Sequence, residues 1–201
     1  MTRTRLVFAT NNKYKLKEIK EIVGNRVELL SLADIGCHTE IPEDHNTLEA
    51  NASQKAFFIY NRYHINCFAD DTGLEIKALG NRPGVYSARY SENTEEVSKD
   101  IRSEANIRKV LREMKGITER KAQFKTVISL VEEGIEKRFE GVVKGEILLT
   151  KKGYMGFGYD PIFMPDGYEI SFAEMKPEEK NGISHRAKAI QKLIDYLNIK
   201  Y

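Results

Sequence analysis

Two adjacent carboxylates, Asp70 and Asp71, stand directly after the apolar run Cys67–Ala69, which is typical of the end of a buried strand. Like charges at this spacing repel each other, and burying either one is costly without a partner. Thr72 and a glycine follow as ordinary turn residues, so one explanation is a solvated turn before a second strand at Leu74–Ile76. The other is a divalent cation, because Mg²⁺ binds one or two carboxylates together with the phosphates of a substrate.

The turn after the apolar run Leu6–Ala9 is a second candidate site. It reads TNNKYK and leads into a helix with one apolar face, so it combines free backbone N–H groups with the positive end of a helix dipole. Its hydroxyl, amide and ammonium side chains favour an anion such as a phosphate. The Walker pattern GxxxxGK(S/T) is absent, and a capped helix with solvated lysines is the alternative. The residues of this turn are Thr10, Asn11, Asn12, Lys13, Tyr14 and Lys15.

The sequence ISHRAKA predicts the start of a C-terminal helix, with Ser184 as its N-cap. His185 and Arg186 then fall in the first turn, where positive side chains oppose the helix dipole. A local rule that is broken without a visible gain indicates a function, and an anionic or carbonyl-bearing ligand accounts for both residues. The alternative is that both side chains point into water.

The loop GFGYD places two glycines around Phe157, with Tyr159 and Asp160 behind it. Glycine allows the backbone to approach a ligand closely, and an aromatic ring held there can stack on a planar base. A tight hairpin that merely needs small residues is the alternative. Together, the acid pair, the anion turn, this loop and the helix start suit a Mg²⁺-bound nucleoside polyphosphate.

The composition is that of a soluble globular chain of 201 residues, enough for one domain or two small ones. A formal net charge of +2 gives no argument for a nucleic acid or a membrane as partner. The two cysteines, Cys37 and Cys67, form no disulfide framework and predict reduced thiols in the cytoplasm. The N-terminal apolar run is too short for a signal peptide.

Short apolar strands alternate with helical patterns, which predicts an α/β fold with a mixed sheet and flanking helices. The strands are expected at Leu6–Ala9, Val27–Leu30, Cys67–Asp70 and Leu74–Ile76, and as an antiparallel hairpin around Gly134. Four helices are expected, each with one inward apolar face. The first ends at Gly24, with Leu16, Ile19, Ile22 and Val23 inward, and the second begins at about Leu48, with Ala52, Ala56, Ile59 and Tyr63 inward. The third runs from Glu95 to Met114, with Val97, Ile101, Val110 and Leu111 inward, and the fourth follows Ser184, with Ile190, Leu193, Ile194 and Leu197 inward.

Five motifs, TNNKYK, FADDTGLEI, PGVYSARY, GFGYDPIF and ISHRAKA, occur in an order and spacing that resembles the HAM1/RdgB family of inosine triphosphate pyrophosphatases. The resemblance runs from Leu6 to about Leu197. It implies a single domain over residues 1–201, an elongated mixed sheet with two lobes around a central nucleotide cleft, and a homodimer. It also implies Mg²⁺-dependent hydrolysis of ITP, dITP and XTP to the nucleoside monophosphate and pyrophosphate, which cleanses the nucleotide pool.

The same resemblance implies roles for individual residues. Asp71 matches the general base and a metal ligand, supported by Asp70, and Glu43 aligns best with the second metal ligand. Asp44 and Glu49 are the alternatives to Glu43, because the segment IPEDHNTLEANASQKA departs from the family pattern. The residues that match substrate-binding positions are Thr10, Asn11, Asn12, Lys13, Tyr14, Lys15, Thr72, Phe157, Gly158, Tyr159, Asp160, Lys180, His185 and Arg186.

Two other functions are alternatives to this one. A haloacid-dehalogenase-type phosphatase needs an acid two residues after its nucleophilic aspartate, and Thr72 and Gly73 stand at those places instead. A nucleotide- or RNA-binding module without turnover fits the basic stretches Lys13–Lys20 and Arg186–Lys192. The acid pair at the expected phosphate site argues against such a module.

Overall fold

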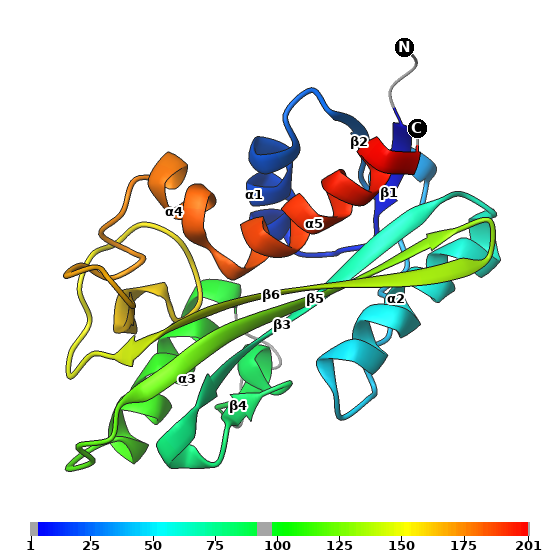
Figure 1. Cartoon of the computed structure of the whole chain (residues 1–201). Coiled ribbons are helices and arrows are strands. Elements are labelled where there is room, and N and C mark those ends of the chain that lie inside the picture. Colours follow the sequence, from blue (N-terminus) through cyan, green and yellow to red (C-terminus); the bar gives the residue numbers. More distant parts are fainter. Residues whose placement is uncertain (1–3, 92–97, 201) are drawn as a thin grey trace. The chain divides into compact units, whose positions relative to one another are not determined.

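A computed structural model describes residues 4–91 and 98–200 of the chain (Figure 1). The longer elements are β1 (Thr4–Phe8), α1 (Lys13–Val23), β2 (Val27–Leu30), α2 (Leu48–Tyr63), β3 (Cys67–Ile76), β4 (Arg82–Gly84), α3 (Lys99–Glu113), β5 (Lys121–Glu132), β6 (Ile135–Ile147), β7 (Phe163–Pro165), α4 (Pro177–Ile183) and α5 (His185–Lys200). Within the described residues, no helix has the length and apolar character needed to cross a membrane.

The strands form one seven-stranded mixed sheet in the order β2-β1-β3-β5-β6-β7, with β4 paired to β3. β1 runs parallel to β2 and β3, whereas β4 is antiparallel to β3 and β7 is antiparallel to β6. β5 and β6 are joined by Glu133 and Gly134, with φ angles of 52° and 81°. Positive φ at both residues is the mark of a tight hairpin turn, so the predicted hairpin and the mixed α/β class are confirmed.

The chain divides into two compact units. Unit 1 comprises residues 1–71, 126–141 and 185–201, and unit 2 comprises residues 72–125 and 142–184. The boundaries fall within β3, β5 and β6, so neither unit is a continuous stretch of chain. The acid pair, which ends at Asp71, therefore belongs to unit 1, and the GFGYD loop belongs to unit 2.

The core of unit 1 has two apolar clusters because β1 alternates its side chains between the two faces of the sheet. Leu6 and Phe8 pack with residues of α1 and α5, whereas Val7 and Ala9 pack with residues of α2. Figure 1 shows α1 and α5 together on one side of β1, with α2 on the other. The predicted inward face of α5 is confirmed, since all four of its residues are buried: Ile190, Leu193, Ile194 and Leu197.

Unit 2 has its own apolar core, centred on three aromatic rings that contact one another, Phe124, Phe163 and Phe172. The buried face of α3 presents Ile107 and Val110 to this core. The prediction that Ile101 points inward is wrong, because its side chain is 55% exposed. The residue sits in the first turn of α3, before the helix reaches the core. The predicted helix start at Glu95 and the inward position of Val97 lie outside the described residues.

The segment that holds the acid pair is one continuous strand, so the alternative of a solvated turn is wrong. β3 runs from Cys67 to Ile76, and Asp70 and Asp71 are only 1% and 7% exposed. Gly73 fits a strand here because a Cβ atom on it would lie 2.5 Å from the backbone oxygen of Gly84 in β4. Close approach of a paired strand, rather than a turn, accounts for this glycine.

Candidate active site

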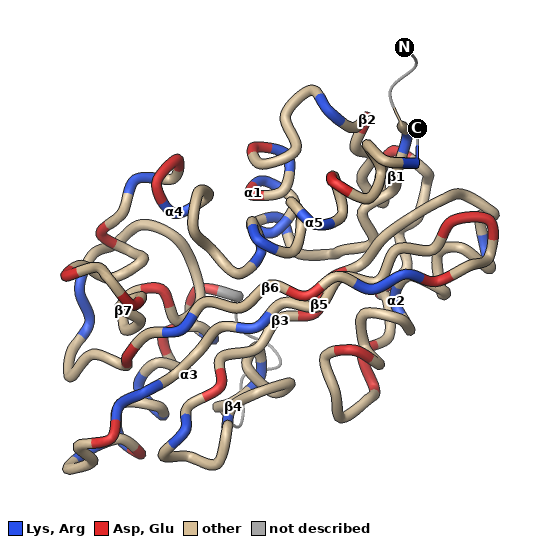
Figure 2. The backbone as a smooth tube through the Cα atoms, in the orientation of Figure 1, with Lys and Arg blue, Asp and Glu red and all other residues tan. Residues whose placement is uncertain are grey.

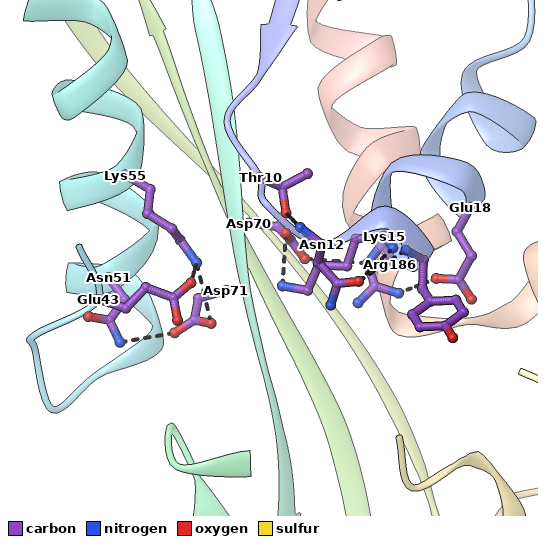
Figure 3. A network of polar contacts seen from close by, with 11 residues as sticks. Thr10, Asn12, Lys15, Glu18, Glu43, Asn51, Lys55, Asp70, Asp71 and Arg186 are labelled. Atoms are coloured by element: carbon purple, nitrogen blue, oxygen red, sulfur yellow. Dashed lines mark hydrogen bonds and ion pairs between the residues drawn. The ribbon is translucent and has the colours of Figure 1, made fainter. Parts of the chain in front are cut away.

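Asp70 lies at the centre of a buried charge network in unit 1. Its Oδ1 accepts a hydrogen bond from Lys15 Nζ at 3.0 Å, and its Oδ2 accepts one from Arg186 Nε at 3.3 Å (Figure 3). The Arg186 guanidinium also forms an ion pair with Glu18 of α1. The network therefore joins β3 to the first turns of both α1 and α5.

Burial and charge act in opposite directions on this network. Burial by itself raises the pKa of Asp70, but the positive charges of Lys15 and Arg186 outweigh it and hold the pKa well below its usual range. Burial likewise lowers the pKa of Lys15, which Asp70 only partly offsets. Asp70 is therefore a fixed negative charge, and a poor candidate for a group that exchanges protons.

Asp71 points to a different set of partners. Its Oδ2 accepts a hydrogen bond from Asn51 Nδ2 at 3.1 Å, and its Oδ1 lies 3.6 Å from Lys55 Nζ (Figure 3). Burial raises the pKa of Asp71, against the opposing charges of Lys55 and Lys15. Successive residues of a strand face opposite sides of the sheet, so Asp70 and Asp71 have separate partners. Asp70 is a structural charge, whereas Asp71 is able to accept a proton.

The residues proposed to hold the metal converge on one point. Glu43 Oε1 and Asp71 Oδ1 both form ion pairs with Lys55 Nζ, so the two carboxylates are arranged around a single cation. This donor set fits Mg²⁺, which takes one or two carboxylates and fills its remaining positions with water and substrate phosphates. Within residues 4–91 and 98–200, no three His, Cys, Asp or Glu residues cluster as a complete protein cage. Asp44 instead bonds Gln54 at the surface, so the geometry favours Glu43 over Asp44.

The segment before α2 is held by the same helix that carries Lys55. Asn51 accepts a hydrogen bond from the backbone N–H of His45 at 2.9 Å and donates one to its carbonyl at 3.2 Å. Asn51 thus fixes both Asp71 and the loop that carries Glu43. The Asn51 side chain therefore fixes where Asp71 and Glu43 lie relative to each other.

The anion turn caps the start of α1. Asn12 Oδ1 accepts hydrogen bonds from the backbone N–H groups of Tyr14 at 3.0 Å and Lys15 at 3.4 Å, and Thr10 Oγ1 accepts one from Asn12 N at 3.1 Å. Asn11 Oδ1 accepts a hydrogen bond from Ile41 N at 3.4 Å, which ties the turn to the segment before Glu43. Phosphate binding by this turn, including its exposed Lys13, stays a prediction.

The start of α5 is buried rather than solvated. His185 and Arg186 are 3% and 1% exposed, so the alternative that both side chains point into water is wrong. Gly141 of β6 makes this packing possible, because a Cβ atom on it would lie 2.0 Å from the carbonyl oxygen of His185. Arg186 contacts Asp70 and Glu18, and the predicted contacts of both residues with a base stay predictions.

The GFGYD loop forms a second polar cluster, within unit 2. Asp160 Oδ2 accepts hydrogen bonds from Phe157 N at 2.8 Å and from Lys180 Nζ at 2.7 Å, and the Lys180 ammonium lies 5.0 Å from the centre of the Phe157 ring. Tyr159 donates from its hydroxyl to the carbonyl of Ser87 at 2.9 Å. Asp160 and Tyr159 thus hold the loop, and Lys180 is itself buried in an ion pair with Asp160. The predicted ligand contacts of Phe157, Gly158 and Lys180 stay predictions.

We expect Gly156→Ala to destabilise the protein far more than Gly158→Ala. Both glycines have positive φ, 75° and 64°, so alanine costs about 1–2 kcal/mol at either position. At Gly156, however, the new Cβ atom would lie 2.1 Å from Asp160 Oδ2, whereas nothing lies within 4 Å at Gly158. Displacing Asp160 breaks its buried pair with Lys180, which adds about 3 kcal/mol. Urea denaturation of both variants is the measurement, and equal losses would contradict this account.

Sequence reasoning missed three residues that the structure brings into the site, namely Asn51, Lys55 and Glu18. Asn51 and Lys55 are four residues apart in α2 and are only 1% and 4% exposed. Polar residues at helical spacing on an otherwise apolar, inward face were the signal that could have found them. Thr72, which follows Asp71 in β3, is half-buried, and its substrate role stays a prediction.

The chain has close relatives of nearly the same length. It is 50% identical over 194 residues to a protein of Christiangramia forsetii named dITP/XTP pyrophosphatase, covering 96% of this chain and 99% of the relative. A protein of the same name from Porphyromonas gingivalis is 47% identical over 194 residues, covering 96% of this chain and 97% of the relative.

Solved structures and a family model agree with these relatives. The Ham1 protein of Staphylococcus aureus has a TM-score of 0.86 and 36% sequence identity, covering 98% of this chain and 100% of that protein. The Ham1 protein of Coxiella burnetii also has a TM-score of 0.86, with 33% identity over 97% of this chain and 98% of that protein. The Ham1 family model matches residues 6–196. On its sequence and its fold, the chain belongs to the Ham1 family.

Proposed function

We propose that this protein hydrolyses the purine nucleoside triphosphates ITP, dITP and XTP to the nucleoside monophosphate and pyrophosphate, with Mg²⁺ as cofactor. The observation that carries the proposal is the convergence of Glu43 and Asp71 on a single cation position, beside the buried Lys15 and Arg186 of the same unit. The names of the bacterial relatives, dITP/XTP pyrophosphatase, support the substrate class and the release of diphosphate.

The reaction is direct attack of water on the α-phosphorus. Asp71 accepts a proton from the attacking water as the new P–O bond forms, and the bond to the leaving pyrophosphate breaks. Asn51 keeps the Asp71 carboxylate oriented, and Lys15 supplies a fixed positive charge for the phosphates. Glu43 and Asp71 would hold Mg²⁺, which when bound neutralises phosphate charge and the charge that develops on the leaving group.

Base recognition is proposed to use hydrogen-bond donors. Inosine and xanthine carry an oxygen acceptor at purine position six, whereas adenine carries an amino donor there. Lys180, His185 and Arg186 are the proposed donors, and a mismatch of donor against donor costs about 1–3 kcal/mol per unmet group. Phe157 would stack on any purine and so affects affinity more than choice of base.

Incubation of the protein with ITP and Mg²⁺ tests the reaction. We expect IMP and pyrophosphate in equal amounts as the primary products, resolved by ion-exchange chromatography. Omission of Mg²⁺ with a chelator present should abolish turnover. IDP and inorganic phosphate as primary products would rule out attack at the α-phosphorus. Binding of ITP without any product would instead support the non-catalytic nucleotide-binding alternative.

A further inference from the structure

Lys55 occupies an unusual place for a lysine. Its side chain is only 5% exposed, in the third turn of α2, and its ammonium forms ion pairs with both Glu43 and Asp71 (Figure 3). These two carboxylates are the ones proposed above to hold the metal. We propose that the Lys55 ammonium is an internal competitor of the divalent cation, which neutralises the two acids in the metal-free protein and thereby sets how tightly the metal binds.

The charge balance of the site supports this exchange. Asp71 is buried and faces the same point as the partly exposed Glu43, and it needs a compensating positive charge, because an unpaired buried charge is strongly destabilising. Lys55 supplies that charge from within the chain. A divalent cation at the same point would meet a buried ammonium of like sign, so its binding has to break both ion pairs of Lys55.

The geometry allows Lys55 to leave without disturbing the rest of the site. Lys55 Nζ faces Oδ1 of Asp71, whereas Asn51 donates to the other oxygen, Oδ2. The hydrogen bonds of Asn51 to the backbone of His45 do not involve Lys55. Asp71 and the loop that carries Glu43 therefore keep their places while a flexible four-carbon side chain gives up its contacts. Figure 2 shows basic and acidic positions interspersed along the tube, and Figure 3 shows Lys55 as the cation between Glu43 and Asp71.

The inference rests on the proposed function, and it makes an unusual prediction, namely that removal of a positive side chain strengthens the binding of a cation. Lys55→Met keeps an unbranched apolar side chain of similar length and removes the ammonium. We expect the metal-free Lys55→Met variant to be less stable than the wild type, because Glu43 and Asp71 lose their counter-charge. We expect it to bind Mn²⁺ at least about tenfold more tightly, because no ammonium competes.

The experiment is titration of the nucleotide-free protein with Mn²⁺ by isothermal calorimetry, together with thermal unfolding with and without the metal. Lys55→Arg retains a positive charge and should keep weak, wild-type-like binding. Lys17→Met, at an exposed lysine of α1, is the matched control for loss of one positive charge and should bind as the wild type does. If Lys55→Met does not fold, Lys55→Gln replaces it in the same comparison.

The outcomes separate this inference from the proposed metal site. Equal or weaker Mn²⁺ binding by Lys55→Met, with clear binding by the wild type, overturns the inference and leaves the metal site intact. Binding by neither protein overturns both. Tighter binding by Lys55→Met, or binding by this variant alone, supports the exchange, and a larger metal-induced rise in its Tm should accompany it.

Discussion

Replacement of Asp71 by asparagine is expected to lower kcat by about 10²–10⁴-fold, the usual contribution of a general base. The amide has nearly the same shape as the carboxylate and can still bond Asn51, so the fold should be retained. It cannot accept the proton of the attacking water. The measurement is the steady-state rate of pyrophosphate release from ITP at saturating Mg²⁺, because Asp71 is also a proposed metal ligand and the variant needs more metal.

Asp166→Asn provides the matched control, since it makes the same chemical change at an exposed position of unit 2. Its kcat should equal that of the wild type. A direct binding measurement with ITP completes the comparison, because Asp71→Asn should still bind the substrate. A near-normal kcat for Asp71→Asn would remove this residue from the chemical step.

Local features of the fold were predictable because local chemistry decides them. Asn12 caps α1, and Gly24 ends that helix with a φ of 52°. α5 begins at His185, directly after Ser184, as predicted. The hairpin between β5 and β6 follows from a glycine at a turn that needs positive φ. In each case the signal lies within a few residues of the structure that it specifies.

Features that depend on distant parts of the chain were not predictable in the same way. Asp70 to Gly73 has turn composition, yet it continues β3, because buried cations satisfy Asp70 and a neighbouring backbone approaches Gly73. Tertiary contacts overrode local propensity here. The helix α4, which positions Lys180, was missed because it spans only seven residues. The sequence motifs predicted the acids Glu43 and Asp71, but the position of Lys55 between them depends on the tertiary fold.

Asp70→Asn is expected to cause a large loss of stability. Asp70 is buried with Lys15 and Arg186, and removal of its charge leaves both cations without the carboxylate that they share. Breaking a buried pair from one side costs about 3–5 kcal/mol, which lowers the Tm of a chain of this size by roughly 6–20 °C. Asp195→Asn, an exposed aspartate of α5, should leave the Tm within about 1–2 °C of the wild type.

A double-mutant cycle with Arg186→Met distinguishes a shared charge network from two independent losses. Arg186→Met alone leaves Asp70 and Glu18 without their common cation and should be strongly destabilising. In the double variant Asp70→Asn with Arg186→Met, both charges of the pair are absent, so neither is left buried without the other. The free energy of unfolding is measured by urea denaturation. Its loss in the double variant should be smaller than the sum of the losses in the two single variants, by at least about 1 kcal/mol. Additive losses would mean that Asp70 and Arg186 stabilise the fold independently, and that the ion pair between them is not what makes each of them important.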